Sequence, residues 1–185
     1  LVCAVQRETE VFIPRGDFIL NAGDKIHITA SRKELVKFMK SLGIYRYKTK
    51  YIMIIGGGKM GFYLAKQLSE SSGYNVKIIE NDVERCKFLS EALPDVKVIN
   101  ADGTDHDVLF EQGMENLDAF VALTTIDEEN IISAMYASSL GITKTVAKVN
   151  RVSSSILGSI GMDSAFSSKS IASNRIVGYI RAISN

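Results

Sequence analysis

A glycine-rich run in this 185-residue sequence has the spacing of a phosphate-binding loop. It fits G-x-G-x-x-G, directly after the apolar stretch 51–55 and directly before a helical pattern. The first glycine permits a tight turn, the second lets the backbone approach a pyrophosphate, and the third allows a helix to pack closely on a strand. Amides at the helix start then bind the anion. We therefore predict a dinucleotide-binding loop, with a ligand-free glycine turn as the alternative. The loop residues are Gly56, Gly57, Gly58, Lys59, Met60 and Gly61.

An acidic residue stands where a dinucleotide-binding domain would use one. Glu80 follows Gly61 by 19 residues and ends the second predicted strand of the alternating region. Dinucleotide-binding domains place there the acid that accepts hydrogen bonds from the adenosine ribose, and its charge repels a 2′-phosphate. We expect Glu80 to bind ribose and to disfavour NADP. Taken alone, it would be read as a solvated surface residue.

Further polar residues follow the next three predicted strands. Asp102 could accept from an adenine amine, and Thr124 with Thr125 could donate to phosphate or ribose oxygens. Each has an alternative reading as a helix cap or turn residue. Lys148, near the end of the fifth strand, could pair with a phosphate or be solvated.

Residue patterns of an enzyme are missing from the sequence. Neither a Ser/His/Asp nor a Cys/His nucleophile pattern is evident, and the histidines, His27 and His106, form no metal-ligand cluster. Cys3 and Cys86 form no CxxC pair, which favours a reduced compartment. We therefore expect no catalytic residue and no metal site.

Charge divides the chain into two parts. Residues 1–50 carry 10 basic and 5 acidic side chains, whereas the other 135 carry 12 and 16, and the net charge is +1. Such a balance suggests two modules and argues against nucleic acid as a partner. The hydrophobic fraction of 46% predicts a folded chain, and the absence of an 18-residue apolar run or export leader predicts no direct membrane insertion.

The elements that would position these residues change type near residue 47. Before it, we expect short strands and a helix that begins with the capping box of Ser31 and Glu34 and stops at Gly43. This piece is too small for a core of its own and reads as the end of a larger lobe. Beyond it, six strands alternate with helices, which predicts an α/β fold with a doubly wound, parallel Rossmann-type sheet. The expected strands are 51–55, 75–80, 96–100, 118–123, 145–149 and 165–167, and the expected helices are 60–71, 83–93, 107–112, 128–140, 154–160 and 171–183.

With these motifs in order, the chain resembles the regulator-of-potassium-conductance (RCK) domain family, most closely the nucleotide-binding subunits of Trk-type potassium uptake systems. The resemblance rests on IGGGKMG at 55–61, IENDVER at 79–85, NADGT at 100–104 and ALTTIDEEN at 122–130. IPRGD at 13–17 and NAGDK at 21–25 resemble the small β-rich carboxyl lobe of the same family. The resemblance implies a partial α+β RCK carboxyl lobe over 1–46 and an RCK amino-terminal, NAD-binding Rossmann domain over 47–185. That order would fit an internal fragment of a tandem protein.

The resemblance implies a regulatory role. The chain would sense NAD(H), with ATP and ADP as further candidate ligands, and gate a Trk-type potassium-translocating membrane subunit. It would be cytoplasmic, held at the inner face of the membrane through that subunit, and a homo-oligomer, either a dimer or a ring, with apolar residues of 171–183 supplying contact surface. Lys148 takes the place of an arginine found in many relatives. The alternative is an NAD-dependent dehydrogenase cofactor domain with its substrate domain elsewhere, which the β-rich piece before residue 51 disfavours.

Overall fold

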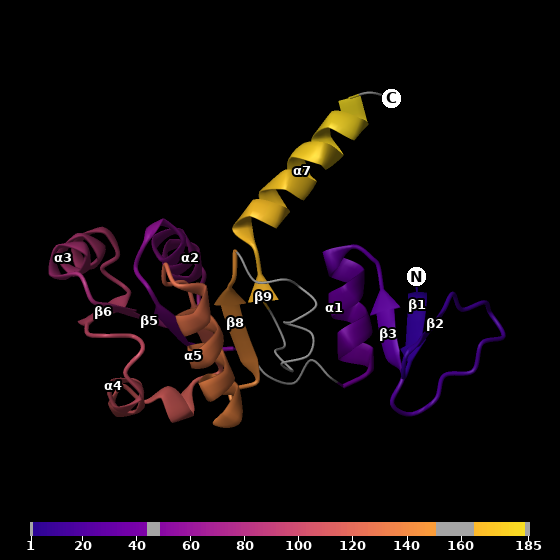
Figure 1. Ribbon diagram of the computed structural model, residues 1–185, viewed down its shortest axis with the longest axis horizontal. Helices are drawn as coiled ribbons and strands as arrows, with labels where there is room; N and C mark the ends of the chain where they lie inside the picture. The colour runs from indigo at the N-terminus through magenta and orange to yellow at the C-terminus, as the bar shows by residue number, and fades with distance from the viewer. Residues whose placement is uncertain (1, 44–48, 151–164, 184–185) are drawn as a thin grey trace. The chain divides into compact units, whose positions relative to one another are not determined.

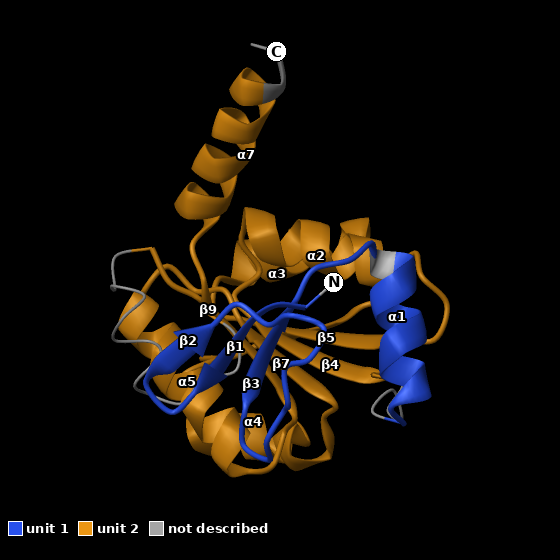
Figure 2. Ribbon diagram, turned by 90° about the vertical axis from the view of Figure 1, so that its right-hand side faces the viewer, with its two compact units in different colours: residues 1–48 blue, residues 49–185 orange. Residues whose placement is uncertain are grey.

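The computed structural model describes residues 2–43, 49–150 and 165–183. The chain divides into two compact units, residues 1–48 and 49–185, which are coloured separately in Figure 2. Each unit has its own sheet.

The first unit is a three-stranded antiparallel sheet and one helix. Its sheet has the order β2-β1-β3, and its elements are β1 (Val2–Arg7), β2 (Glu10–Phe12), β3 (Lys25–Ile28) and α1 (Arg32–Ser41). The predicted capping box is present, because the Ser31 side chain accepts from the Glu34 amide while the Glu34 side chain accepts from the Ser31 amide. Arg7 forms an ion pair with Asp24, with 2.8 Å between Nε and Oδ1.

The second unit contains a six-stranded parallel sheet in the order β6-β5-β4-β7-β8-β9. This order confirms the predicted doubly wound, Rossmann-type fold, in which the strand order reverses beside the first strand. The strands are β4 (Tyr51–Ile55), β5 (Asn75–Glu80), β6 (Lys97–Asn100), β7 (Ala119–Ala122), β8 (Lys144–Lys148) and β9 (Ala165–Phe166). The helices are α2 (Lys59–Ser69), α3 (Val83–Ala92), α4 (His106–Glu111), the 3₁₀ turn η1 (Met114–Asn116), α5 (Asp127–Ser139) and α7 (Ser168–Ile183).

Helices cover both faces of this sheet, as Figure 1 shows. Helices α2 and α3 pack on one face, where Ala65 and Leu89 join Ile54 and Ile78 in a buried cluster. Helices α4 and α5 with η1 cover the other face, where Met53, Ile79 and Phe120 are buried. Strands β4 and β7 are buried on both faces, which is why their sequences are apolar without alternation.

The carboxyl-terminal part of the second unit has exposed apolar side chains. Helix α7 presents Ile171, Ile176, Val177 and Tyr179 with 43–70% of their surface accessible. The helix expected over 154–160 lies outside the described residues. Among the helices that the structure describes, none combines the length and apolar character that a membrane span requires.

Candidate functional site

The glycine run forms the connection between β4 and α2. Gly56 follows the last residue of β4 with φ of +92°, and its amide donates to the carbonyl of Ile79 on the neighbouring strand at 2.9 Å. A Cβ at this position would lie 2.9 Å from backbone atoms of Leu123 and Thr124. Both the dihedral angle and the close approach therefore require glycine here.

The other glycines of the run differ in what surrounds them. A Cβ on Gly61 would lie 2.1 Å from the Gly56 carbonyl oxygen, so its role in close packing is plain from the geometry. A Cβ on Gly57 would lie 2.4 Å from Cδ1 of Leu89. Around Gly58 no atom lies within 4 Å of the corresponding point. The backbone at Gly58 consequently faces open space in which a ligand could approach.

Glu80 holds the glycine run through its carboxylate. Its Oε2 accepts from the Gly57 amide at 2.7 Å, and its Oε1 accepts from the Asp82 amide at 2.9 Å. The acid thus ties the β4–α2 loop to the β5–α3 loop. Each carboxylate oxygen has a further lone pair, so acceptance from a ribose hydroxyl is chemically compatible with these bonds.

Arg85 also binds Gly57, and the sequence analysis assigned it no role. Its Nε donates to the Gly57 carbonyl at 2.7 Å, and its guanidinium lies over the ring of Phe88, 4.6 Å from the centroid. Asp82 caps helix α3 by accepting from the Arg85 amide. The sequence held no local signal for the arginine's contact, because it joins residues 28 positions apart.

A cleft of about 290 Å³ opens at the carboxyl ends of β4, β5 and β7. It lies where open α/β sheets bind ligands, beside the point of strand-order reversal. Of the predicted residues, the cleft brings together Gly56, Gly58, Glu80, Asp102, Thr124 and Thr125. Those outside its lining are Gly57, Lys59, Met60, Gly61 and Lys148.

Asp102 forms the turn that closes one side of the cleft. Its Oδ1 accepts from the Thr104 amide at 2.8 Å and from the Thr104 hydroxyl at 2.7 Å. The Thr104 amide first, and its hydroxyl second, lower the pKa of Asp102 below its usual value. Asp102 is therefore a charged turn residue, and a ligand contact would use its remaining acceptor capacity.

The opposite side of the cleft is built around Thr124. Its hydroxyl accepts from the Ile126 amide at 3.2 Å and donates to the Ile126 carbonyl at the same distance, as a turn residue does. The ammonium of Lys148 donates to the Thr124 carbonyl. Lys148 thus supports the β7–α5 loop and is not among the residues that line the cleft.

Asn130 is a site residue to which the sequence analysis assigned no role, although it ends the 122–130 motif. It is completely buried and accepts from the Thr124 amide at 2.8 Å. Its side-chain amide donates to the carbonyls of Thr124 and Lys148, at 3.2 and 3.0 Å. A buried asparagine with three such bonds fixes the ends of β7 and β8 relative to each other.

The start of helix α2 is suited to an anion. Gly58 is its N-cap and offers no side chain to the first-turn amides, while the Phe62 amide already donates to the Gly58 carbonyl. First-turn amides and the helix dipole attract negative charge. A phosphate over Gly58 would fit both the open space and this electrostatic field.

Comparison with known proteins identifies related sequences. The family model of the TrkA-N domain matches residues 52–168. The Trk system potassium uptake protein TrkA of Haemophilus influenzae is 33% identical over 181 residues, which is 97% of this chain and 39% of that protein. The chain thus spans about two fifths of the length of this curated relative.

Solved structures share the fold. The NAD(P)-binding domain of an exopolyphosphatase-related protein from Archaeoglobus fulgidus has a TM-score of 0.59 at 18% identity, covering 73% of this chain and 99% of that one. The GsuK RCK domain has a TM-score of 0.62 at 20% identity, covering 95% and 37%. At these identities the likeness concerns the fold alone.

Proposed function

Because this chain belongs to the TrkA-N domain family, we propose that it is a nucleotide-sensing regulatory part of a Trk-type potassium transport system. One observation carries the proposal: the glycine run and Glu80 are joined by a 2.7 Å hydrogen bond at the rim of a cleft on the carboxyl edge of the sheet. This arrangement puts the glycine loop and the acid in the places where dinucleotide-binding domains have them, which supports the proposal.

The proposed ligand is NAD(H), with ATP and ADP as competitors for the same loop. The pyrophosphate would lie over Gly58 and the first turn of α2, in the space where no protein atom approaches. The adenosine ribose would donate to Glu80, and its 2′-phosphate form would be repelled by that carboxylate. Asp102, Thr124 and Thr125 line the same cleft and would contact the rest of the nucleotide.

The proposed partner is the potassium-translocating membrane subunit of a Trk-type system. The curated relative named above is a Trk system potassium uptake protein, and the GsuK structure is an RCK domain. We propose a cytoplasmic location at the inner membrane face, reached through that subunit. Exposed Ile171, Ile176 and Val177 of α7 support assembly with further copies of the chain as a dimer or ring.

Calorimetric titration of the chain with NADH, NAD, NADPH, ATP and ADP tests the binding part. We expect saturable binding of NADH and weaker binding of NADPH. The gating part needs potassium flux through the reconstituted membrane subunit with the protein bound, measured with NADH, with ATP and without nucleotide. A regulator must bind its ligand differently in two states, so flux has to change between these conditions.

Identical flux in all three conditions, together with NADH binding, would count against sensing and favour the dehydrogenase alternative. Absence of any nucleotide binding would contradict both.

A further inference from the structure

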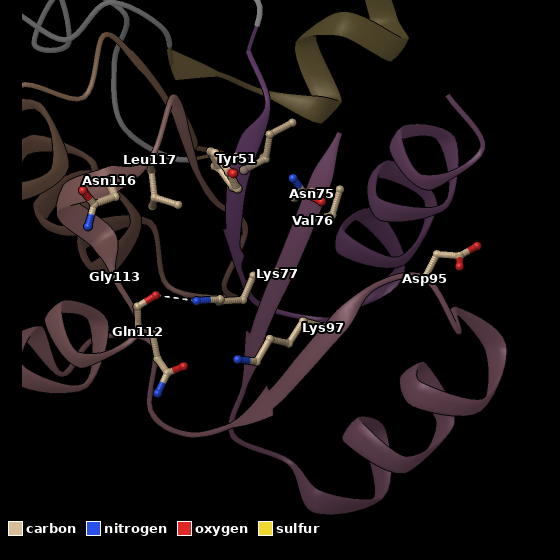
Figure 3. A pocket seen from close by; sticks show the side chains of 11 residues that line it. Tyr51, Asn75, Val76, Lys77, Asp95, Lys97, Gln112, Gly113, Asn116 and Leu117 are labelled. Atoms are coloured by element: carbon tan, nitrogen blue, oxygen red, sulfur yellow. Dashed lines mark hydrogen bonds between the residues drawn. The ribbon is translucent and has the colours of Figure 1, made fainter. Parts of the chain in front are cut away.

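A second hollow, of about 350 Å³, lies at the opposite end of the same sheet. It is bordered by Tyr51 and Asn75, the first residues of β4 and β5, and by the turn that follows α4. Figure 3 shows it from close by. We call it the lysine pocket, after Lys77 and Lys97 in its lining. Its volume is within the range of about 300–1,000 Å³ common for small-molecule sites.

The two lysines are neighbours across the sheet. Lys77 of β5 pairs with Lys97 of β6 in parallel register, and two residues later Ile79 pairs with Ile99. Because side chains alternate along a strand, each lysine shares a face with its isoleucine, and both isoleucines pack in the cluster under α4. Both ammonium groups therefore project from one face, toward the turn at Gln112 (Figure 3).

Like charges directly opposite each other destabilise a sheet. Among residues 2–43, 49–150 and 165–183, no carboxylate lies within 4 Å of either ammonium. Asp95 also borders the pocket, but its side chain points away from both lysines (Figure 3). Burial lowers the pKa of Lys77, and the charge of Lys97 lowers it further. An anion between the two groups would relieve this repulsion.

Lys77 has a structural role that Lys97 lacks. The Lys77 ammonium donates to the carbonyl of Gln112, which is the C-cap of α4, and a cation is favourable at a helix end. An ammonium has three donors, so two stay available to a ligand. Lys97 is exposed on the edge strand β6, and its ammonium caps no helix within the described part of the chain. The cap alone therefore does not account for the pair.

We propose that the lysine pocket binds a small organic phosphate monoester, with the dianionic phosphate between the ammonium groups of Lys77 and Lys97 and the organic part against Leu117. Two cations match the charge of such a dianion. Leu117 provides apolar lining, and the side-chain amides of Gln112 and Asn116 provide polar groups nearby. This site is separate from the nucleotide cleft, which lies at the carboxyl ends of the strands.

Phenyl phosphate is the probe, titrated into the full 185-residue chain and followed by amide NMR signals of Gly113 and Leu117. The Gly58 amide reports separately on the glycine loop. We expect saturable shifts at Gly113 and Leu117, weaker binding of inorganic phosphate because it lacks the apolar part, and no shift with phenol. Shifts at Gly58 alone, or none at the pocket, would overturn the proposal.

Lys97→Met removes one charge, keeps the apolar stem and leaves the α4 cap in place. We expect phenyl phosphate to bind at least about tenfold more weakly to it. Lys87→Met, which removes an exposed lysine of α3 paired with Glu84, is the matched control and should bind as the parent does. If Lys97→Met fails to fold, Lys97→Gln makes the same test. Equal affinity of the parent and a folded Lys97 variant for phenyl phosphate would contradict the proposal. The proposed nucleotide binding at Gly58 does not depend on that outcome.

Discussion

The carboxylate of Glu80 accepts a hydrogen bond of 2.7 Å from the amide of Gly57, so the acid proposed to bind ribose also anchors the glycine loop. Its other oxygen accepts from the Asp82 amide. Glutamine has only one acceptor oxygen in its side chain, and its NH₂ group would face an amide donor. A substitution at this position therefore changes loop anchoring as well as ligand recognition.

Glu80→Gln should weaken NADH binding by about 1–3 kcal/mol, the range for a hydrogen bond to a charged group. If the substitution only loosened the loop, the binding of NADH and the binding of NADPH would weaken equally. Loss of the negative charge should favour NADPH relative to NADH, because repulsion of the 2′-phosphate is removed. Calorimetric affinities for both nucleotides measure this ratio.

Glu84→Gln is the control for the loss of one acidic charge nearby. Glu84 lies in the first turn of α3 and pairs with Lys87 on the surface. We expect this variant to retain the parent preference for NADH. A Glu80→Gln variant with the same NADH-to-NADPH ratio as the parent would show that Glu80 anchors the loop and does not contact ribose.

Gly58→Val separates ligand binding from folding. The position has φ of −58°, and no neighbouring atom lies within 4 Å of the point that a Cβ would occupy, so valine should be accommodated without loss of thermal stability. Its side chain would occupy the space proposed for the pyrophosphate, and NADH binding should become undetectable by calorimetry. A folded variant with parent affinity would rule out the loop as the phosphate site.

Gly61→Ala is the matched substitution with the opposite expectation. Its Cβ would lie 2.1 Å from the carbonyl oxygen of Gly56, so α2 would have to move away from the loop. We expect a loss of unfolding free energy on the order of 1–3 kcal/mol, as for other overpacked sites. Chemical denaturation of the two variants side by side gives the comparison.

The loop and the sheet were predictable because their signals are local. The glycine spacing and the apolar strands lie within short segments, and residues such as Gly56 and Glu80 occupy positions fixed by strand and turn. Arg85 and Asn130 were not predictable in their roles, since each makes its contacts through tertiary structure. The pairing of Lys77 with Lys97 likewise depends on sheet register between residues 20 positions apart.

Lys148 shows the limit of reasoning from strand order. Its place at the end of β8 predicted a charge at the ligand edge, but a long flexible side chain can reach several acceptors. In the structure the ammonium binds the Thr124 carbonyl, and the residue is not among those lining the cleft. Its role toward a phosphate stays a prediction.

Asn130→Ala should destabilise the second unit. The substitution leaves the part-buried Thr124 amide and Lys148 carbonyl without their asparagine partner. Each buried polar group left unpaired costs about 1–3 kcal/mol. Urea denaturation measures the change, and Asn116→Ala, at an exposed asparagine of the same unit, should have little effect. Equal stability of the two variants would contradict the bridging role of Asn130.

Acid should unfold the first unit through Asp24. Hydrogen bonds from Arg7, and then from the Asn21 amide, lower the pKa of Asp24 to about 2, and its side chain is only 2% exposed. The unfolded-state pKa of aspartate is about 3.9. In the folded state Asp24 binds a proton less readily than in the unfolded state. The stability that its carboxylate gives the first unit is therefore complete above about pH 4 and is lost as the pH falls through about 2.

Amide NMR signals of Val5 in β1 report on the first unit during a pH titration, and those of Ile54 in β4 report on the second. Asp24→Asn removes the titrating group, so it should destabilise the first unit at neutral pH and converge with the parent near pH 2. Asp17→Asn, at an exposed aspartate of the same unit, should follow the parent at every pH. A difference between Asp24→Asn and the parent that is constant from pH 7 to pH 2 would mean that the ion pair with Arg7 does not control the acid stability of this unit.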